Sequence, residues 1–125
     1  MRRWMGLIAV GALVLGAADA RAGDVEKGKQ AYGKCKACHA LEDGKTGIGP
    51  SLHGIFGRKA GSVPKFAYSK DMAALGLAWD DDSLRNYLRN PKQMVPNTKM
   101  VFAGITRDAE LDDLLAYLKV ATKPQ

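Results

Sequence analysis

Two cysteines and a histidine stand together in the segment Cys35-Lys36-Ala37-Cys38-His39, a spacing typical of covalent haem attachment. Two thiols three residues apart at the end of a helix lie on one side of the chain, so both can reach the vinyl groups along one haem edge. The adjacent imidazole can then turn onto the iron. The segment therefore predicts a haem bound through Cys35 and Cys38, with His39 as one axial ligand.

Other uses of these cysteines compete with haem attachment, and a chance match of five residues is one of them. A zinc ribbon needs two further ligands, for which the sequence offers only His53. A thioredoxin-like redox pair is expected within a βαβ unit, and no such pattern surrounds Cys35. A disulfide across so small a loop would stabilise the fold little. A metal or disulfide module is the non-haem alternative, and it predicts a colourless protein.

The sixth position of the iron needs a second ligand if the haem carries electrons. Methionine often fills it, because its thioether favours ferrous iron. After residue 22 the sequence contains Met72, Met94 and Met100. Met72 falls in a predicted helix and is most simply a gap-filling residue, whereas Met94 and Met100 lie in an irregular stretch that can approach a metal. Spacing alone does not choose between these two.

The first 22 residues have the three parts of a secretory signal. A basic start is followed by an apolar run over residues 4–18 and by a small-x-small motif at 20–22. The run is shorter than the roughly 20 residues that span a bilayer, although an uncleaved anchor or an N-terminal core helix is the alternative. We expect a signal peptide at 1–22, cleaved near Ala22, and one mature domain at 23–125.

The charge of the chain limits its partners. The sequence has 19 basic and 13 acidic residues, a formal charge of +6. Cleavage after Ala22 would remove three arginines and one aspartate and leave +4. A mild positive charge suits an acidic protein or an anionic membrane. Nucleic acid is the weakest candidate, because no run of Lys and Arg exceeds two and aromatic residues are not interleaved with basic ones.

Four short helical patterns account for the regular structure, and no alternating strand pattern or internal repeat appears. Each pattern has a residue suited to start or stop a helix. The expected helices run from Asp24 toward Cys35, from Ser69 to Leu75 before Gly76, from Asp81 to Asn90 between the cap Asp80 and Pro91, and from about Arg107 to Ala121 behind the cap Thr106.

Long segments rich in glycine, proline and lysine separate these helices, notably His39–Tyr68 and Gln93–Gly104. Loops of this length are unusual in a compact domain unless something besides their own side chains organises them. Short helices alone enclose little core in about a hundred residues. A flat apolar macrocycle would supply the missing core.

Longer segments resemble the class I cytochromes c, the family of the mitochondrial electron carrier and its periplasmic bacterial relatives. The resemblance spans the mature chain and rests on GDVEKG at 23–28, GPSLHG at 49–54, FGRKAG at 56–61, YLRNPK at 87–92, PNTKMVFAG at 96–104 and YLK at 117–119. It implies an all-α class I cytochrome c fold, with short helices and long loops wrapped around one covalently bound haem c.

The same resemblance assigns individual residues. Met100 is the implied sixth ligand, and the Pro50 carbonyl is the implied acceptor of the His39 ring N–H, which fixes the tautomer. Gly28 would let the first and last helices cross closely, with Tyr32 and Tyr117 nearby. The implied haem contacts are Arg58, Tyr68 and Trp79 around the propionates, Tyr87 and Thr98 on the methionine side, and Phe102 at the exposed edge.

Two positions depart from the family pattern. Asn97 stands where the family usually has glycine, so we expect Asn97 at a positive φ, which asparagine tolerates better than most residues. Met72 stands where the family usually has a polar asparagine near the haem, so the buried hydrogen bonding there is expected to differ.

The resemblance implies an electron carrier and not an enzyme, because two occupied axial positions leave no room for a substrate at the iron. The implied donor is a membrane cytochrome bc-type complex, and the implied acceptor is a terminal oxidase of a respiratory chain or a photosynthetic reaction centre. Two alternatives are an electron-entry subunit held in a larger enzyme and a haem peroxidase or sensor with an open sixth site.

The mitochondrial carrier has no cleaved secretory signal, so residues 1–22 place this chain in a bacterial periplasm. We expect a monomer that docks on acidic partners through lysines near the haem edge. These lysines are Lys34, Lys36, Lys45, Lys92 and Lys99.

Overall fold

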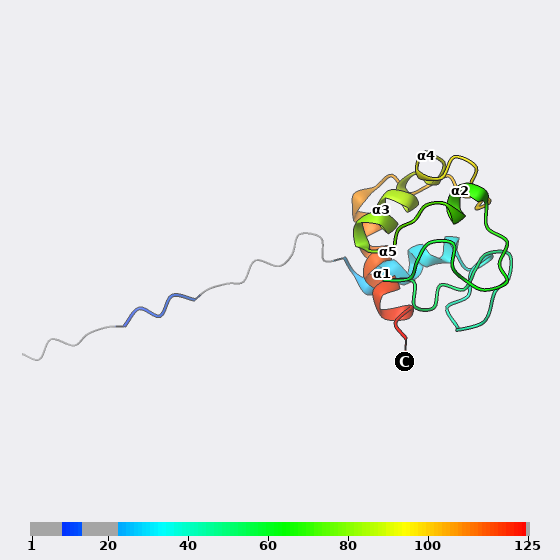
Figure 1. The fold of residues 1–125 in the computed structure, drawn as a ribbon. Coiled ribbons are helices and arrows are strands. Elements are labelled where there is room, and N and C mark those ends of the chain that lie inside the picture. Colours follow the sequence, from blue (N-terminus) through cyan, green and yellow to red (C-terminus); the bar gives the residue numbers. More distant parts are fainter. Residues whose placement is uncertain (1–8, 14–22, 125) are drawn as a thin grey trace, which may run out of the picture.

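The structure, a computed structural model, describes residues 9–13 and 23–124. Its helices are α1 (Val25–Ala31), continued by the 3-10 turn η1 (Tyr32–Lys34), α2 (Lys70–Ala73), α3 (Asp81–Arg89), α4 (Pro91–Met94) and α5 (Asp108–Ala121) (Figure 1). Within these described ranges the only strand-like pairing is an isolated bridge between Lys59 and Ala78. The predicted all-α fold with long loops is therefore confirmed. No described helix has the length and apolar character needed to cross a membrane. The predicted signal peptide lies outside the described residues except for 9–13.

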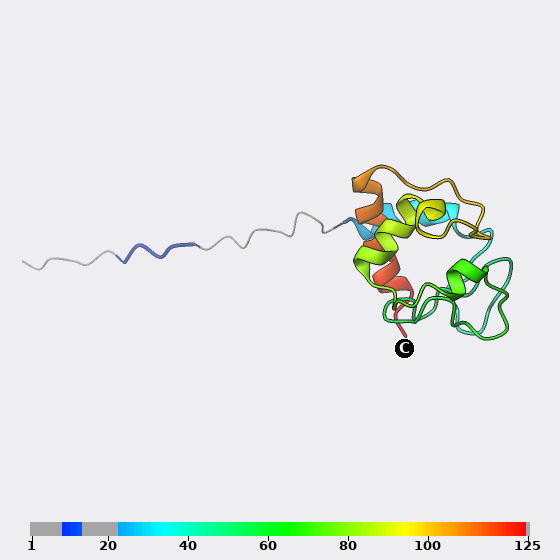
Figure 2. The ribbon, with the colours of Figure 1, turned by 45° about the horizontal axis from the view of Figure 1, so that its top comes forward.

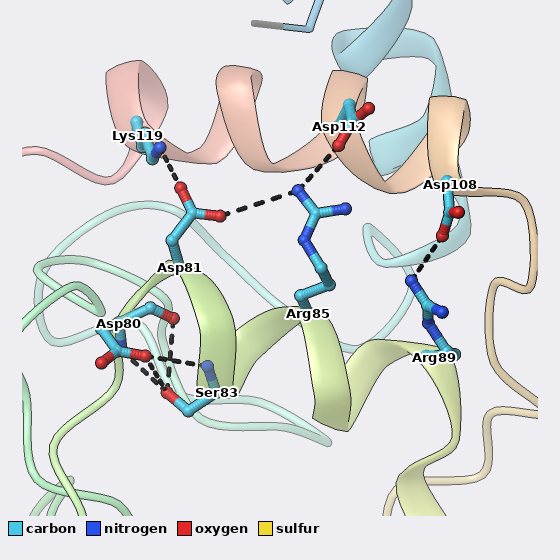
Figure 3. A network of polar contacts seen from close by, with 8 residues as sticks. All are labelled: Asp80, Asp81, Ser83, Arg85, Arg89, Asp108, Asp112 and Lys119. Carbon is cyan, nitrogen blue, oxygen red and sulfur yellow. Dashed lines mark hydrogen bonds and ion pairs between the residues drawn. The ribbon is translucent and has the colours of Figure 1, made fainter. Parts of the chain in front are cut away.

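Two of the three predicted caps, Asp24 and Asp80, begin their helices. Ser69, predicted as the first residue of a helix, is instead the cap of α2. The Asp24 carboxylate accepts the Lys27 N–H at 3.0 Å, and the Ser69 hydroxyl accepts the Met72 N–H at 3.1 Å. Asp80 and Ser83 form a reciprocal capping box at the start of α3 (Figure 3). Each bond satisfies a backbone donor that the first helical turn leaves without a partner.

Two helix ends differ from the prediction. The cap of α5 is Arg107, which makes no side-chain bond to the helix, so the assignment of Thr106 as the cap is wrong. Acidic residues in the first turn, Asp108 and Glu110, stabilise that positive end instead. The sequence patterns also missed α4, which ends at Met94, so the expected irregular conformation of Gln93 and Met94 is wrong. Pro91 ends α3 but begins α4, because proline at the first helical position lacks only an N–H that would have no partner there.

The predicted close crossing of the first and last helices, α1 and α5, is confirmed (Figure 1). A Cβ on Gly28 would lie 1.9 Å from the Asp113 carbonyl oxygen, so only glycine fits this crossing. The rings of Tyr32 and Tyr117 pack beside it with centroids 5.5 Å apart. Tyr32 belongs to the same buried cluster as Leu111, Leu114 and Leu118 of α5, and Tyr117 packs against this cluster.

Ion pairs join α3 to the same helix α5 (Figure 3). Arg85 lies 2.7 Å from Asp112 and 3.8 Å from Asp81, and Asp81 also pairs with Lys119. Nearer the start of α5, Arg89 pairs with Asp108. We call α1, α3 and α5 together the helical frame.

The rest of the domain, residues 39–79 and 95–107, is called the loop half. It contains α2 and lies beside the helical frame in both ribbon views (Figures 1 and 2). Buried side chains from both regions form a shared cluster, which includes Ile55, Met72, Trp79, Tyr87 and Leu115. This cluster borders the cavity described next.

Candidate haem site

An apolar cavity of about 230 Å³ lies between the helical frame and the loop half. Packed protein interiors rarely contain voids much larger than a water molecule, so a cavity of this size is a ligand site. Every residue that the sequence assigned to cofactor or iron lines it. These are Cys35, Cys38, His39, Pro50, Arg58, Tyr68, Trp79, Tyr87, Thr98, Met100 and Phe102.

The cysteines reach the cavity because the first helix tightens before it ends. The 3-10 turn η1 closes at Cys35, whose N–H donates to the Tyr32 carbonyl at 2.8 Å. The Cys35 carbonyl in turn accepts the N–H groups of Cys38 at 3.1 Å and His39 at 2.9 Å. One turn of chain thus presents both sulfurs and the imidazole to the same cavity, as thioether attachment requires.

The surroundings of Cys35 differ from those of an attacking redox cysteine. Burial raises the pKa of the Cys35 thiol to about 11. The attacking cysteine of a thioredoxin-like pair has a lowered pKa instead, because the thiolate is the nucleophile. For zinc, the described part of the chain contains no cluster of three or more His, Cys, Asp or Glu side chains that could hold a metal ion. The geometry therefore favours the haem interpretation of Cys35 and Cys38.

His39 is held in one orientation from two sides. Its Nδ1 lies 2.7 Å from the Pro50 carbonyl oxygen, which can only accept, so Nδ1 carries the proton and Nε2 is left as a ligand atom. The backbone of Gly49 lies against the same ring, and a Cβ there would approach it to 2.6 Å. This arrangement matches the predicted contact between His39 and Pro50.

On the methionine side, Met100 lines the cavity whereas Met94 packs against the core cluster and is not among the lining residues. The Met100 N–H donates to the Thr98 hydroxyl at 3.4 Å, and that hydroxyl lies 2.7 Å from the Tyr87 hydroxyl. Burial raises the pKa of Tyr87, so its hydroxyl stays neutral. Through the Thr98 hydroxyl, Tyr87 of α3 therefore positions the segment that carries Met100.

Arg58 provides a test of whether the cavity fits a haem. The half-buried guanidinium donates to the carbonyls of Ser51 and His53, each at 2.9 Å, and burial lowers its pKa. No carboxylate among the described residues pairs with it. A buried charge is costly without an opposite charge, and haem brings two propionates into the cavity that Arg58 lines. The donor set and this cation both fit the group.

The backbone conformation of Asn97 differs from the prediction. Lys65 is the only non-glycine residue with a positive φ in the described ranges, so the expected positive φ at Asn97 is wrong. Asn97 instead donates from its backbone N–H and its side-chain amide to Asp71, at 3.1 and 2.9 Å. The asparagine therefore makes a side-chain contact that glycine could not make.

Apolar residues of the cavity wall were not singled out from the sequence as site residues. They include Ile48, Leu52, Ile55, Leu84, Leu114 and Leu118. Leu84, Leu114 and Leu118 lie on the buried faces of α3 and α5, but helical periodicity does not say whether such a residue faces a core or a ligand. Met72 also lines the cavity and is 8% exposed, in agreement with a gap-filling role.

Comparison with known proteins agrees with the haem interpretation of this cavity. The sequence profile of the cytochrome c family, described as "Cytochrome c", matches residues 25–122. Cytochrome c-550 of Nitrobacter winogradskyi is 50% identical over 97 residues, covering 77% of this chain and 89% of the relative. Cytochrome c of Gibberella zeae is 46% identical over 103 residues, covering 81% and 97%. The solved structure of cytochrome cH from Methylobacterium extorquens superimposes with a TM-score of 0.74 at 45% identity, covering 78% of this chain and 99% of that one.

Proposed function

The chain belongs to the cytochrome c family and binds haem c covalently, and on this premise we propose that it carries single electrons with His39 and Met100 as the axial ligands. The attachment sites are Cys35 and Cys38. One observation carries the proposal. These four side chains line one apolar cavity, although Cys35 and Met100 are 65 residues apart in the sequence.

Bound haem supplies an iron that gains and loses one electron. The residues of this chain hold its surroundings constant while it does so. The Pro50 carbonyl fixes the His39 imidazole, and the Thr98 hydroxyl restrains the Met100 segment. The apolar cavity wall keeps water away, which limits the rearrangement that accompanies a change of charge.

Members of the family are electron carriers, and we propose that this chain is not an enzyme. With a nitrogen and a sulfur ligand both in place, a substrate has no free position on the iron. An open-site peroxidase or sensor would require Met100 to leave the cavity that it lines. A permanently bound electron-entry subunit would differ by stable co-purification with a larger enzyme.

We place the mature protein in a bacterial periplasm, as a monomer that a cytochrome bc-type complex reduces and that a terminal oxidase or photosynthetic reaction centre oxidises. Docking at the cavity mouth is supported by two exposed apolar side chains that line the cavity, Ile48 (79% exposed) and Val101 (102%). An apolar centre with charged surroundings is typical of a protein interface.

The predicted docking lysines differ in their surroundings. Lys34 lies 2.5 Å from Glu110, and Lys45 pairs with Glu42, so their charges are partly neutralised. Lys99 donates to the Ala67 carbonyl at 3.0 Å, which leaves its charge uncompensated. Lys36 and Lys92 are exposed, with no ion pair among the described residues. We therefore expect Lys36, Lys92 and Lys99 to attract an acidic partner most strongly.

The ligation is tested with an absorption spectrum of the purified holoprotein in both oxidation states. A low-spin c-type spectrum with the weak red band of ferric iron bound to methionine sulfur is expected. Met100→Ala should abolish that band and Met94→Ala, the matched control, should keep it. A high-spin wild-type spectrum that shifts with carbon monoxide would instead establish an open site.

Docking is tested by the rate at which a partner complex reduces the protein. Lys36→Glu combined with Lys92→Glu should slow reduction at low salt and leave the absorption spectrum unchanged, because charge steers encounter. The difference should vanish at high salt. Lys123→Glu, near the C-terminus, is the control. Equal rates for the double variant and the wild type at low salt would rule out this docking face.

A further inference from the structure

The segment that carries Met100 makes few backbone contacts with the rest of the molecule. The Thr98 N–H donates to the Val95 carbonyl and the Phe102 N–H to the Met100 carbonyl, so these bonds stay within the segment. The next backbone bond to another element joins the Ile105 N–H to the Leu88 carbonyl. Between residues 96 and 104 the segment is therefore held mainly through side chains.

One carboxylate makes two of those side-chain contacts. The same oxygen of Asp71, Oδ2, accepts the Asn97 backbone N–H at 3.1 Å and the Asn97 side-chain amide at 2.9 Å. Asp71 is half-buried in the first turn of α2, and Asn97 lies three residues before Met100. Hydrogen bonds to an ionised acceptor are stronger than neutral ones. This pair joins the methionine segment to the far part of the loop half.

A second contact acts in parallel. Lys99 Nζ donates to the Ala67 carbonyl at 3.0 Å, four residues before Asp71. Both contacts therefore attach residues 97–99 to the short stretch 67–71. Because Met72 follows Asp71 and lines the cavity, movement of this stretch would change the cavity wall as well as the methionine segment.

We propose that Asp71 and Asn97 form a latch that keeps the Met100 sulfur at the iron against competing ligands. Neither residue touches the cofactor, so both are positioning residues. The inference rests on the proposed ligation by Met100. When Met100 leaves the iron, the bonds between Asp71 and Asn97 break. Without these bonds the ligated state loses that stabilisation, and an external ligand replaces Met100 more readily.

The latch is tested by titrating ferric holoprotein with imidazole and following the loss of the methionine–iron band. Asp71→Ala should raise the apparent affinity for imidazole about fivefold, since a net hydrogen-bond contribution near 1 kcal/mol corresponds to that factor. Asn97→Ala, which keeps the backbone bond, should raise it about twofold. The double variant should match Asp71→Ala alone, because both changes remove one interaction.

Two further variants separate a latch from a general effect of charge or folding. Asp71→Asn retains an acceptor oxygen and should restore most of the wild-type affinity. Asp43→Ala removes an exposed carboxylate that has no hydrogen bond or ion pair within the described residues, and it should behave as wild type.

The outcomes distinguish the two proposals. If the wild type shows the methionine band and Asp71→Ala binds imidazole no more tightly than Asp43→Ala, the latch alone is overturned. If the wild type lacks the band at every pH, ligation by Met100 fails and the latch fails with it.

Discussion

In the helical frame, backbones meet directly and need no other group between them. Gly28 lets α1 lie on the backbone of α5, and ion pairs fasten α3 to the same helix (Figure 3). In the loop half, backbone bonds such as that from the Gly57 N–H to the Trp79 carbonyl are supplemented by bonds from side chains to backbone carbonyls, as from His39 to Pro50. The frame has buried residues away from the cavity, such as Tyr32 and Leu111. The loop half surrounds the cavity together with Leu114 and Leu118 of α5.

This difference indicates how the domain divides its stability. We expect the frame to keep residual structure without haem, whereas the loops around the cavity need the haem as their core. Two residues bring segments of the chain close together in different ways. Gly28 removes a side chain to bring helices together, whereas Asn97 adds one to bring loops together.

The largest effect should come from removing covalent attachment with Cys35→Ser and Cys38→Ser. A cavity of about 230 Å³ left without its group costs about 5 kcal/mol, a large part of the stability of a domain this size. We expect a colourless chain with fast amide exchange throughout residues 39–79 and residual protection confined to α1 and α5. Slow exchange retained in the loop half would contradict the comparison.

Gly28→Ala should destabilise the frame by more than about 3 kcal/mol, because its Cβ would collide with the backbone of α5 and the helices would have to separate. Gly33→Ala is the matched control, since a Cβ at Gly33 has no neighbour within 4 Å. Urea unfolding of the holoprotein measures both. Similar midpoints for the two variants would show that the crossing tolerates adjustment.

Within the frame, replacing Arg85 should destabilise the fold more than replacing Arg89. The Arg85 side chain is 14% exposed and faces Asp112 and Asp81, whereas Arg89 is 44% exposed beside the still more exposed Asp108. Arg85→Ala should cost about 2 kcal/mol, because it leaves the partly buried carboxylate of Asp112 without its ion-pair partner, whereas Asp81 keeps Lys119. Arg89→Ala should cost less than about 0.5 kcal/mol. Thermal unfolding at low and high salt checks this order, and equal costs would contradict it.

A small gain is expected in the loop half from Lys65→Gly. Lys65 has φ +66° after Pro64, in a turn closed by a bond from the Phe66 N–H to the Val63 carbonyl at 3.4 Å. Glycine removes the strain of that φ but adds freedom to the unfolded chain, for a net stabilisation of about 0.5 kcal/mol. Lys65→Ala keeps the strain and removes the charge, so it should give no gain in the same unfolding assay.

The smallest effect should appear only in acid. Bonds from the Ser83 N–H and hydroxyl lower the pKa of Asp80 below its ordinary value of 3.8. Its contribution to stability is therefore complete above that pH and is lost as the pH falls through the folded pKa. In Asp80→Asn the unfolding midpoint should decline less steeply below pH 4 than in the wild type. Asp43→Asn is the control, and an unchanged slope in Asp80→Asn would show that the cap carries no such dependence.

The sequence alone determined the chemistry of the attachment segment, because two thiols and an imidazole must be adjacent in the chain to serve one haem edge. It also determined the caps Asp24 and Asp80 and the buried stripe of α5, because these depend on residues within a few positions of one another. Resemblance to the family added the residues that line the cavity. It could not supply the contact of Asn97, since this chain departs from the family there.

Residue spacing did not separate Met100 from Met94, and the family resemblance only implied the choice. The tertiary structure shows that Met100 faces the cavity and that Met94 ends the helix α4. It also showed that Thr106 is not the cap of α5 and that Asn97 avoids a positive φ. For Asn97 the physical reason is its contact with Asp71. Loop conformation is set by contacts with residues far away in the sequence, as Asp71 sets Asn97 across 26 positions, and no local pattern records those contacts.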